Sequence, residues 1–250
     1  MSQSYQRQSR IALDDVHYAP FAPGERELKL LGPVSGKRVL ELACGAAQNS
    51  IALSRWGATV VALDISSAQL AHALKLKDGE AAKIELVRGD MERPSMFMPG
   101  SFDIALSSFG WEFIPDLEGC LRECHALLKP NGLLVVSTTH PLSAFEWDER
   151  EGAVLVTDYF SPPVEVWTDP VPEGHDPAVT IFRTFQEMFE LITGAGFRVE
   201  RVLEPYPERL PPDASPEADG SPYAGEYWEK TRERMLKVPF AIVYVARRGA

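Results

Sequence analysis

The chain has 250 residues, of which 45% are hydrophobic and 24% are charged. This composition predicts a globular domain with a full core, and no stretch approaches 18 uninterrupted apolar residues, so no membrane span is expected. The formal net charge of −11 disfavours a nucleic-acid substrate, because phosphate backbones are bound by basic surfaces.

Residues 25–140 alternate between predicted helices and predicted strands. Apolar or β-branched runs predict the strands, and capping residues followed by amphipathic spacing predict the helices. The clearest helix has Asp116 as its N-cap and apolar residues at intervals of three and four. Helices are expected over 25–31, 50–56, 66–77 and 117–128, and strands over 39–42, 59–63, 84–87, 102–106 and 133–136. This rhythm predicts an α/β fold with a parallel sheet covered on both faces.

Residues 142–180 break the rhythm. They hold aromatic residues among many prolines and acids, with strand-like pieces at 153–157 and 164–167. We interpret this segment as an insert that lies over the working edge of the sheet. A capping box beginning at Thr184 then predicts another helix. That helix is expected to end at Ile192. The elements expected after it are a strand over 197–203, a loop over 207–222 and a last strand over 240–245.

The first strand leads into a turn of small residues, and the second strand ends at Asp64. This is the layout of a nucleoside site, because small residues let the backbone approach the ligand and the carboxylate accepts hydrogen bonds from ribose. A dinucleotide site would need three glycines, but Ala43, Gly45 and Gln48 stand at those positions. An adenosyl sulfonium has no phosphates, and Glu41 is a suitable neighbour for its positive charge.

Five segments between residues 37 and 140 stand in a distinctive order and spacing. They are Val39–Ala47, Asp64, Gly89-Asp90-Met91, Phe102–Ala105 and Leu128–Gly132. Together they resemble the motifs of class I S-adenosylmethionine-dependent methyltransferases of the small-molecule branch. In that family the second segment binds ribose and the third meets adenine.

The resemblance implies a Rossmann-like, seven-stranded α/β sheet whose last strand is antiparallel. It implies an enzyme that transfers a methyl group from S-adenosylmethionine to a small-molecule acceptor by in-line displacement. The implied cofactor contacts are Tyr18, Glu41, Ala43, Cys44, Gly45, Asp64, Ile65, Asp90, Met91 and Ser107. The family usually has glycine where this chain has Ala43 and Ala47, and alanine there would cost on the order of 1 kcal/mol if φ were positive.

Candidate acceptor-side residues follow the fourth and fifth strands. His140 is either a general base that removes a proton from the acceptor, or a residue that caps the strand or contacts the substrate without proton transfer. His17, Trp111 and Tyr159 are candidate substrate contacts, although Trp111 would serve equally as a packing residue under the insert. A base is optional, because alignment of nucleophile and methyl can supply much of the rate.

The whole chain, 1–250, is expected to form one domain, with a lid segment at 1–24 and a substrate-side insert at 142–180. No metal site is expected, because Cys120, Cys124 and His125 share one helix without a second ligand pair. The cysteines and the absence of an apolar leader predict a cytoplasmic location, and the oligomeric state is left open. Two alternatives remain: a non-catalytic S-adenosylmethionine-binding protein and a nicotinamide-dependent oxidoreductase.

Overall fold

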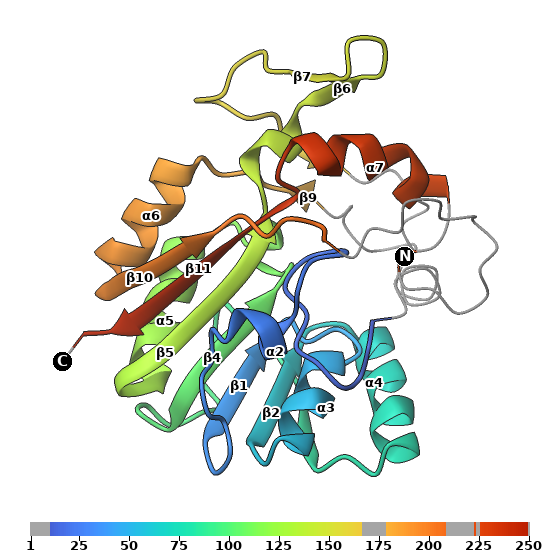
Figure 1. Ribbon diagram of the computed structural model, residues 1–250. Coiled ribbons are helices and arrows are strands. Elements are labelled where there is room, and N and C mark those ends of the chain that lie inside the picture. Colours follow the sequence, from blue (N-terminus) through green and yellow to red (C-terminus); the bar gives the residue numbers. More distant parts are fainter. Residues whose placement is uncertain (1–10, 167–178, 209–222, 224–225, 250) are drawn as a thin grey trace.

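A seven-stranded sheet forms the centre of the computed structural model, which describes residues 11–166, 179–208, 223 and 226–249 (Figure 1). The strand order is β10-β11-β5-β4-β1-β2-β3. The strands are β1 (Arg38–Leu42), β2 (Thr59–Asp64), β3 (Ile84–Arg88), β4 (Phe102–Ser108), β5 (Leu128–Thr139), β10 (Phe197–Leu203) and β11 (Ala241–Arg248). β11 is antiparallel to both of its neighbours, whereas β1 to β5 are mutually parallel. The predicted sheet, with its last strand antiparallel, is confirmed.

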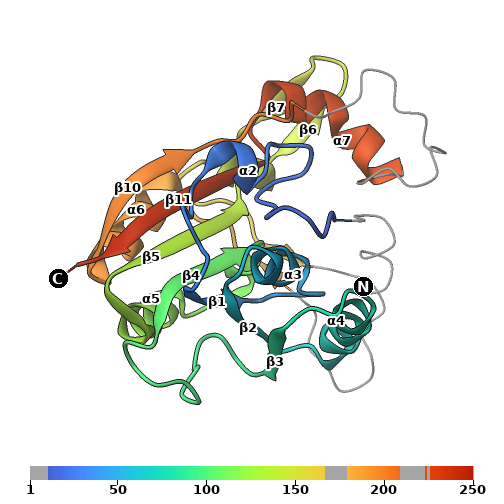
Figure 2. The same cartoon turned by 60° about the horizontal axis from the view of Figure 1, so that its bottom comes forward.

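Helices cover both faces of the sheet, as the alternation predicts (Figures 1 and 2). On one face, α5 (Leu117–Leu127) and α6 (Phe185–Gly194) bury an apolar core against the strands. On the other face, α3 (Gln48–Arg55) and α4 (Ser67–Gly79) bury a second core. Both cores exist because adjacent residues of a doubly covered strand point to opposite faces and are all apolar.

The three predicted helix caps are confirmed. The side chains of Ser66, Asp116 and Thr184 each accept a hydrogen bond from the backbone N–H three residues on. Each cap satisfies one of the N–H groups that the first helical turn leaves unpaired.

Two helices differ from the prediction. α2 covers only Glu25–Leu28, because Lys29 adopts a left-handed conformation with φ 51° and ends the helix before residue 31. α7 (Glu226–Lys237) was not expected at all, since its sequence is dominated by charged residues. Of the predicted loop over 207–222, residues 209–222 lie outside the described residues.

The insert and α7 lie beyond the carboxyl edge of β5 (Figure 1). The insert contains short strands, β6 (Glu146–Asp148), β7 (Ala153–Leu155), β8 (Glu165–Val166) and β9 (Val179–Thr180), paired as β6–β7 and β8–β9. Residues 167–178 lie outside the described residues. The side chain of Arg234 on α7 donates to the Leu142 carbonyl at 2.7 Å, so α7 is fastened to the start of the insert. None of the helices in the described ranges is long and apolar enough to cross a membrane.

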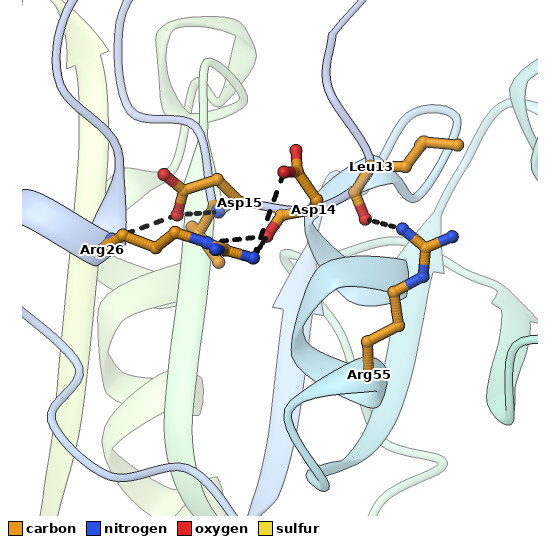
Figure 3. Close-up of polar contacts among 6 residues, drawn as sticks. Leu13, Asp14, Asp15, Arg26 and Arg55 are labelled. Atoms are coloured by element: carbon orange, nitrogen blue, oxygen red, sulfur yellow. Dashed lines mark hydrogen bonds and ion pairs between the residues drawn. The ribbon is translucent and has the colours of Figure 1, made fainter.

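Residues 11–24, which we call the strap, run from α3 to α2 (Figure 3). Arg55 on α3 donates to the Leu13 carbonyl at 2.7 Å. Arg26 on α2 donates to the Asp14 carbonyl, and the Asp15 carboxylate accepts from the Arg26 backbone N–H. Polar contacts therefore fasten residues 13–15, which we call the outer part of the strap, to α3 and to α2. The remaining part of the predicted lid, residues 1–10, lies outside the described residues.

Candidate functional site

The carboxyl ends of β1, β2 and β4 meet at one edge of the sheet, where open α/β folds bind ligands. The turn after β1 is drawn toward β2 by two hydrogen bonds. The Gly45 N–H donates to the Asp64 carboxylate at 2.7 Å, and the Cys44 N–H donates to the Leu63 carbonyl at 2.9 Å. The turn and the acid that the sequence paired are therefore in direct contact.

Asp64 closes β2 with a carboxylate that retains accepting capacity. One oxygen accepts from Gly45, the other accepts from the Ser66 N–H at 2.8 Å, and the Ile65 backbone also bonds the carboxylate. A carboxylate has about four acceptor positions, so about one is left for a ligand. Burial raises the pKa of Asp64, and these backbone bonds oppose the rise. The neighbouring Ile65 side chain is 66% exposed, which leaves an apolar surface beside the carboxylate. Asp90, beyond β3, is half-buried and accepts from the Glu92 N–H.

Glu41 is buried near the end of β1, and its carboxylate caps α3. One carboxylate oxygen accepts from the Ser50 N–H at 3.0 Å and also from the Ser50 hydroxyl. Burial raises the pKa of Glu41 to about 7, and the bonds to Ser50 act against that rise. A nearby cation would stabilise its charged form.

This donor set fits an adenosyl sulfonium and opposes a pyrophosphate. A dinucleotide fold presents free loop N–H groups and an open helix N-terminus to the phosphates. Here Gly45 donates to Asp64, and Glu41 places a carboxylate at the start of α3. Carboxylates at the ends of β1 and β2 would repel phosphate charge and attract a cation or ribose hydroxyls.

Ala43 and Ala47 both have positive φ, at 52° and 60°. Left-handed backbone costs an L-residue roughly 1–2 kcal/mol, so the turn is strained at both positions. An energetic cost was expected for these two alanines if their φ angles were positive, and both angles are positive.

Four further predicted cofactor contacts are buried, besides Glu41 and Asp64. Cys44, Met91 and Ser107 are 5%, 7% and 0% exposed, and the Ser107 hydroxyl has no partner among the described residues. Tyr18 is fully buried, and its hydroxyl donates to Glu25 at 2.7 Å. Among them, Ser107 alone leaves a buried polar atom for a ligand to satisfy.

Residues 17 and 18, which we call the inner part of the strap, cross the ends of β4 and β5. Asn49 on α3 accepts from the His17 N–H at 2.8 Å, and the Ser108 hydroxyl donates to the His17 carbonyl at 3.0 Å. The Ser137 hydroxyl donates to the Tyr18 carbonyl. The strap thus lies over the edge where the candidate site is assembled.

The His17 ring contacts an aromatic cluster formed by Phe21, Tyr223, Trp228 and Phe240. Its Nε2 is hydrogen-bonded to the Tyr223 hydroxyl, and burial lowers the pKa of His17 to about 4. Within the cluster, Tyr223 and Trp228 pack edge to face at 4.8 Å. The cluster joins the strap to α7 above the sheet edge.

Trp111 and Glu112 belong to a short 3₁₀ helix, η1 (Trp111–Phe113), after β4. Trp111 is 1% exposed and lines a cavity of about 10 Å³, the size of one water molecule. This placement favours the packing interpretation of Trp111. Arg183, itself buried, donates to the carbonyls of Trp111 and Ile114 and holds the loop in place.

Glu112 is a buried carboxylate to which the sequence assigned no role. Its two oxygens accept from the hydroxyls of Thr138 and Thr139, at 3.1 and 3.2 Å. Burial raises the pKa of Glu112 to about 7, while these hydroxyls and the charge of Arg183 oppose the rise. The available signal was a charged residue between aromatic residues in the loop after a buried strand.

His140 uses both ring nitrogens. Nδ1 accepts from the Leu142 N–H at 3.2 Å and caps a second 3₁₀ helix, η2 (Pro141–Ala144). Nε2 lies 3.0 Å from Glu204, so the proton of the neutral ring is assigned to Nε2. Burial lowers the pKa of His140, and Glu204 opposes that effect. This arrangement favours the capping interpretation over that of a general base.

Tyr159, the remaining substrate candidate, lies in the insert. Its hydroxyl accepts from the Phe185 N–H at 3.4 Å, which connects the insert to the start of α6. In the part of the chain that the structure describes, no group of three or more His, Cys, Asp or Glu side chains is arranged to hold a metal ion.

Sequence reasoning missed Asn49, Ser108 and Arg183. Asn49 and Arg183 are buried polar residues, and all three bind backbone carbonyls of segments distant in sequence. A polar residue on an otherwise buried helix turn was the one signal for Asn49.

The chain is similar in sequence and in fold to known proteins. Residues 40–136 match the family described as methyltransferase domain. A ubiquinone biosynthesis O-methyltransferase of Pseudomonas aeruginosa is 35% identical over 107 residues, which cover 42% of this chain and 45% of that protein. Its namesake in Bradyrhizobium diazoefficiens is 37% identical over 135 residues, covering 54% and 51%. The chain thus spans about half the length of the curated relatives it matches.

A solved structure extends the likeness to most of the chain. The crystal structure of an S-adenosylmethionine dependent methyltransferase from Mesorhizobium loti has a TM-score of 0.65 to this chain at 25% identity. The match covers 88% of this chain and 95% of that one.

Proposed function

We propose that the chain is an enzyme that methylates a small-molecule acceptor, on the premise that residues 40–136 match the methyltransferase-domain family and that the fold is that of an S-adenosylmethionine-dependent methyltransferase. The observation that carries the proposal is the sign of charge at the site. Glu41 and Asp64 occupy the helix start and the loop N–H that a pyrophosphate would need. This arrangement disfavours a nicotinamide cofactor and suits a cationic, phosphate-free one.

The proposed cofactor contacts are those at the ends of β1 to β4. Asp64 accepts hydrogen bonds from the ribose hydroxyls, and the exposed Ile65 provides an apolar surface for adenine. Asp90 accepts from the adenine amino group. Glu41 and the unpartnered Ser107 hydroxyl lie toward the charged methionyl end.

When bound, S-adenosylmethionine supplies a methyl carbon already activated by its sulfonium. The chain then has to hold the acceptor in line and exclude water, which alone can supply a large rate factor. The strap, the aromatic cluster and the insert are the elements that would do this, because they lie over or beyond the carboxyl edge. The strap's bonds to Asn49 and Ser108 support its role as a lid.

The acceptor class rests on charge and surroundings. The net charge of −11 disfavours nucleic acid, and the aromatic cluster favours a small aromatic or apolar acceptor. The ubiquinone biosynthesis enzymes are named as O-methyltransferases, which makes phenols the first acceptors to try. Three buried cysteines with free thiols support a reducing, cytoplasmic compartment.

Two measurements test the proposal. Calorimetry should show binding of S-adenosylhomocysteine and no binding of NADH. Asp64→Ala should weaken that binding by about 1.5–3 kcal/mol, roughly 10–150-fold, and Asp64→Asn should fall between. Asp103→Asn, which alters a carboxylate at the opposite edge of the sheet, is the matched control. Unchanged affinity in both Asp64 variants would refute the ribose assignment.

Turnover is tested with S-adenosylmethionine and a panel of small phenols, hydroxyl compounds and amines. Formation of S-adenosylhomocysteine that depends on the acceptor would confirm an enzyme. Tight binding without turnover on any panel member would favour the alternative of a non-catalytic cofactor-binding protein.

A further inference from the structure

The backbone conformation of Gly110 does not explain why this residue is glycine. Gly110, in the loop between β4 and η1, has φ −127° and ψ −24°, a negative φ that L-residues adopt. A Cβ atom built on Gly110 would lie 2.4 Å from the Cβ of Ala43. Carbon atoms pack at about 3.5–4.0 Å, so the methyl group of Ala43 excludes any side chain from position 110.

The backbone of Ala43 has the opposite preference. Its φ of 52° lies in the left-handed region, where glycine is favoured and alanine is strained. The chain therefore carries a methyl group where the backbone favours glycine, and glycine where the backbone would accept a methyl group. The choice of alanine at position 43 and of glycine at position 110 is therefore understood only when the two residues are considered together.

The contact joins the two loops that matter most to the site. Ala43 follows β1 in the turn that holds Gly45 against Asp64, and Gly110 directly precedes Trp111. The strands are hydrogen-bonded neighbours, with Leu42 opposite Ser107. A Cβ on Gly110 would also come within 3.2 Å of the unpartnered Ser107 hydroxyl.

Phe109 holds the loop after β4 in place beside Gly110. Phe109 has φ 56°, and its N–H donates to the Ser137 carbonyl at 2.9 Å. Its ring packs on Phe240, with 6.0 Å between centroids. Strained backbone of this kind persists only where the surroundings hold it. Gly110 therefore has little room to retreat from a larger neighbour.

We propose that Ala43 and Gly110 are a matched pair of positioning residues. Their contact sets the separation between the cofactor-side turn after β1 and the acceptor-side loop after β4. The meaning given to these two loops rests on the proposed function, whereas the steric match itself does not.

A double-mutant cycle tests the pair, with melting temperature and calorimetric affinity for S-adenosylhomocysteine as readouts. Gly110→Ala should lower the affinity by about tenfold or more and the Tm by about 3 °C or more, because two methyl groups cannot share the space. Ala43→Gly should raise the Tm slightly. The double variant Ala43→Gly/Gly110→Ala should recover most of the affinity and Tm that Gly110→Ala loses, because the clash between the two methyl groups is gone and only the 3.2 Å approach to the Ser107 hydroxyl remains.

Two controls separate positioning from general stability. In Gly132→Ala the new Cβ would lie 2.8 Å from the Lys129 carbonyl oxygen, at the opposite edge of the sheet, so the Tm should fall while affinity is kept. Ala81 has φ 50° in the turn after α4, so Ala81→Gly relieves the same kind of strain far from the site. It should raise the Tm and leave affinity unchanged.

The pair is refuted if Gly110→Ala retains the parent Tm and affinity, or if the double variant is no better than Gly110→Ala alone. If Gly110→Ala does not fold, a folded double variant with most of the parent affinity supports the pair, and an unfolded one refutes it. A parent chain that binds no S-adenosylhomocysteine would refute the proposed function. The Tm cycle of the four chains would still decide whether the steric match exists.

Discussion

His140 shows how a side chain's hydrogen bonds limit its chemistry. A general base needs a ring nitrogen with a free lone pair within reach of the acceptor. The Nδ1 lone pair of His140 accepts from Leu142, and the proton on Nε2 faces Glu204. The neutral ring therefore has no lone pair left for a substrate proton.

We predict that His140→Asn retains turnover within a few-fold of the parent, on any acceptor found by the panel. The asparagine Oδ1 can take the place of Nδ1 and accept from the Leu142 N–H, so η2 keeps its cap. Kinetics across pH 5–9 check this expectation. A fall of about 10²–10⁴-fold with loss of the acidic limb would instead make His140 the base. Glu204→Gln, which removes the charge beside the ring, is the control.

Glu112 should make the stability of the chain depend on pH. Burial raises its pKa to about 7, from an ordinary value of 4.5, so the folded state holds this proton more tightly than the unfolded state does. Its contribution to stability is then complete below pH 4.5 and is lost as the pH rises through 7. Glu112→Gln stays neutral and avoids that loss.

We therefore predict that Glu112→Gln gains stability over the parent between pH 5 and 8, by up to about 3 kcal/mol. Urea unfolding at four pH values in this range measures the difference. Glu85→Gln, at an exposed position on β3, is the control. Curves that run parallel to the parent's would show that Thr138, Thr139 and Arg183 already keep the carboxylate charged in the folded state.

At the scale of elements, the features that depend on residues close in sequence were predictable, and the features that depend on contacts between distant residues were not. The caps at Ser66, Asp116 and Thr184 were predictable because each is a bond between residues three apart. The helix α7 was not, because the contacts that hold it come from distant residues: Arg234 donates to the Leu142 carbonyl, and Trp228 packs against Phe21 and Phe240 within the aromatic cluster. Charged residues fill the rest of α7 and hide its apolar side.

In the candidate site too, the position of residues along the chain was predictable, and the contacts of their side chains were not. The order of turn, helix and terminal acid placed Glu41 and Asp64 at one edge, and the sheet register brings them there. The direction of each side chain could not be read from the sequence. The capping of α3 by Glu41, the burial of Tyr18 against Glu25 and the steric match at Gly110 all depend on tertiary packing.

The strap gives a prediction at this scale. Asn49 bonds both the N–H and the carbonyl of His17, so it clips the strap to α3. Asn49→Ala should speed hydrogen exchange in residues 11–24 and weaken S-adenosylhomocysteine binding by roughly fivefold, the effect of about 1 kcal/mol. In the parent, bound S-adenosylhomocysteine should protect 11–24 and the insert. Protection confined to 37–140 would contradict the lid.

Arg55→Ala is the matched variant for that experiment. It releases the Leu13 carbonyl, at the outer end of the strap (Figure 3), and it also removes the ion pair of Arg55 with Glu80 at the end of α4, which makes no contact with the strap. Exchange should then quicken near Leu13, while binding stays close to that of the parent. Equal losses of affinity in both variants would mean that the strap acts as one rigid piece.

At the scale of the whole molecule, the two ends of the described chain are built into one structure. β11, from the carboxyl end, lies between β5 and β10, and residues 241–246 are all buried. The strap, from the amino end, reaches the aromatic cluster through Phe21, which lies against Tyr223 and Trp228. Neither end can leave without exposing apolar surface that belongs to the other.

We therefore predict that the chain unfolds in one cooperative transition. Far-ultraviolet circular dichroism follows the sheet and helices. Tryptophan fluorescence sums the signals of five tryptophans, which include Trp56 at the end of α3, Trp111 in η1 and Trp228 on α7. The two urea curves should share one midpoint. Val243→Ala, at a fully buried position of β11, should lower the stability by about 2 kcal/mol and shift both midpoints together, because β11 is hydrogen-bonded to both β5 and β10. A fluorescence change that precedes the loss of secondary structure, and that Trp228→Phe abolishes, would show that α7 and the strap open as a unit of their own.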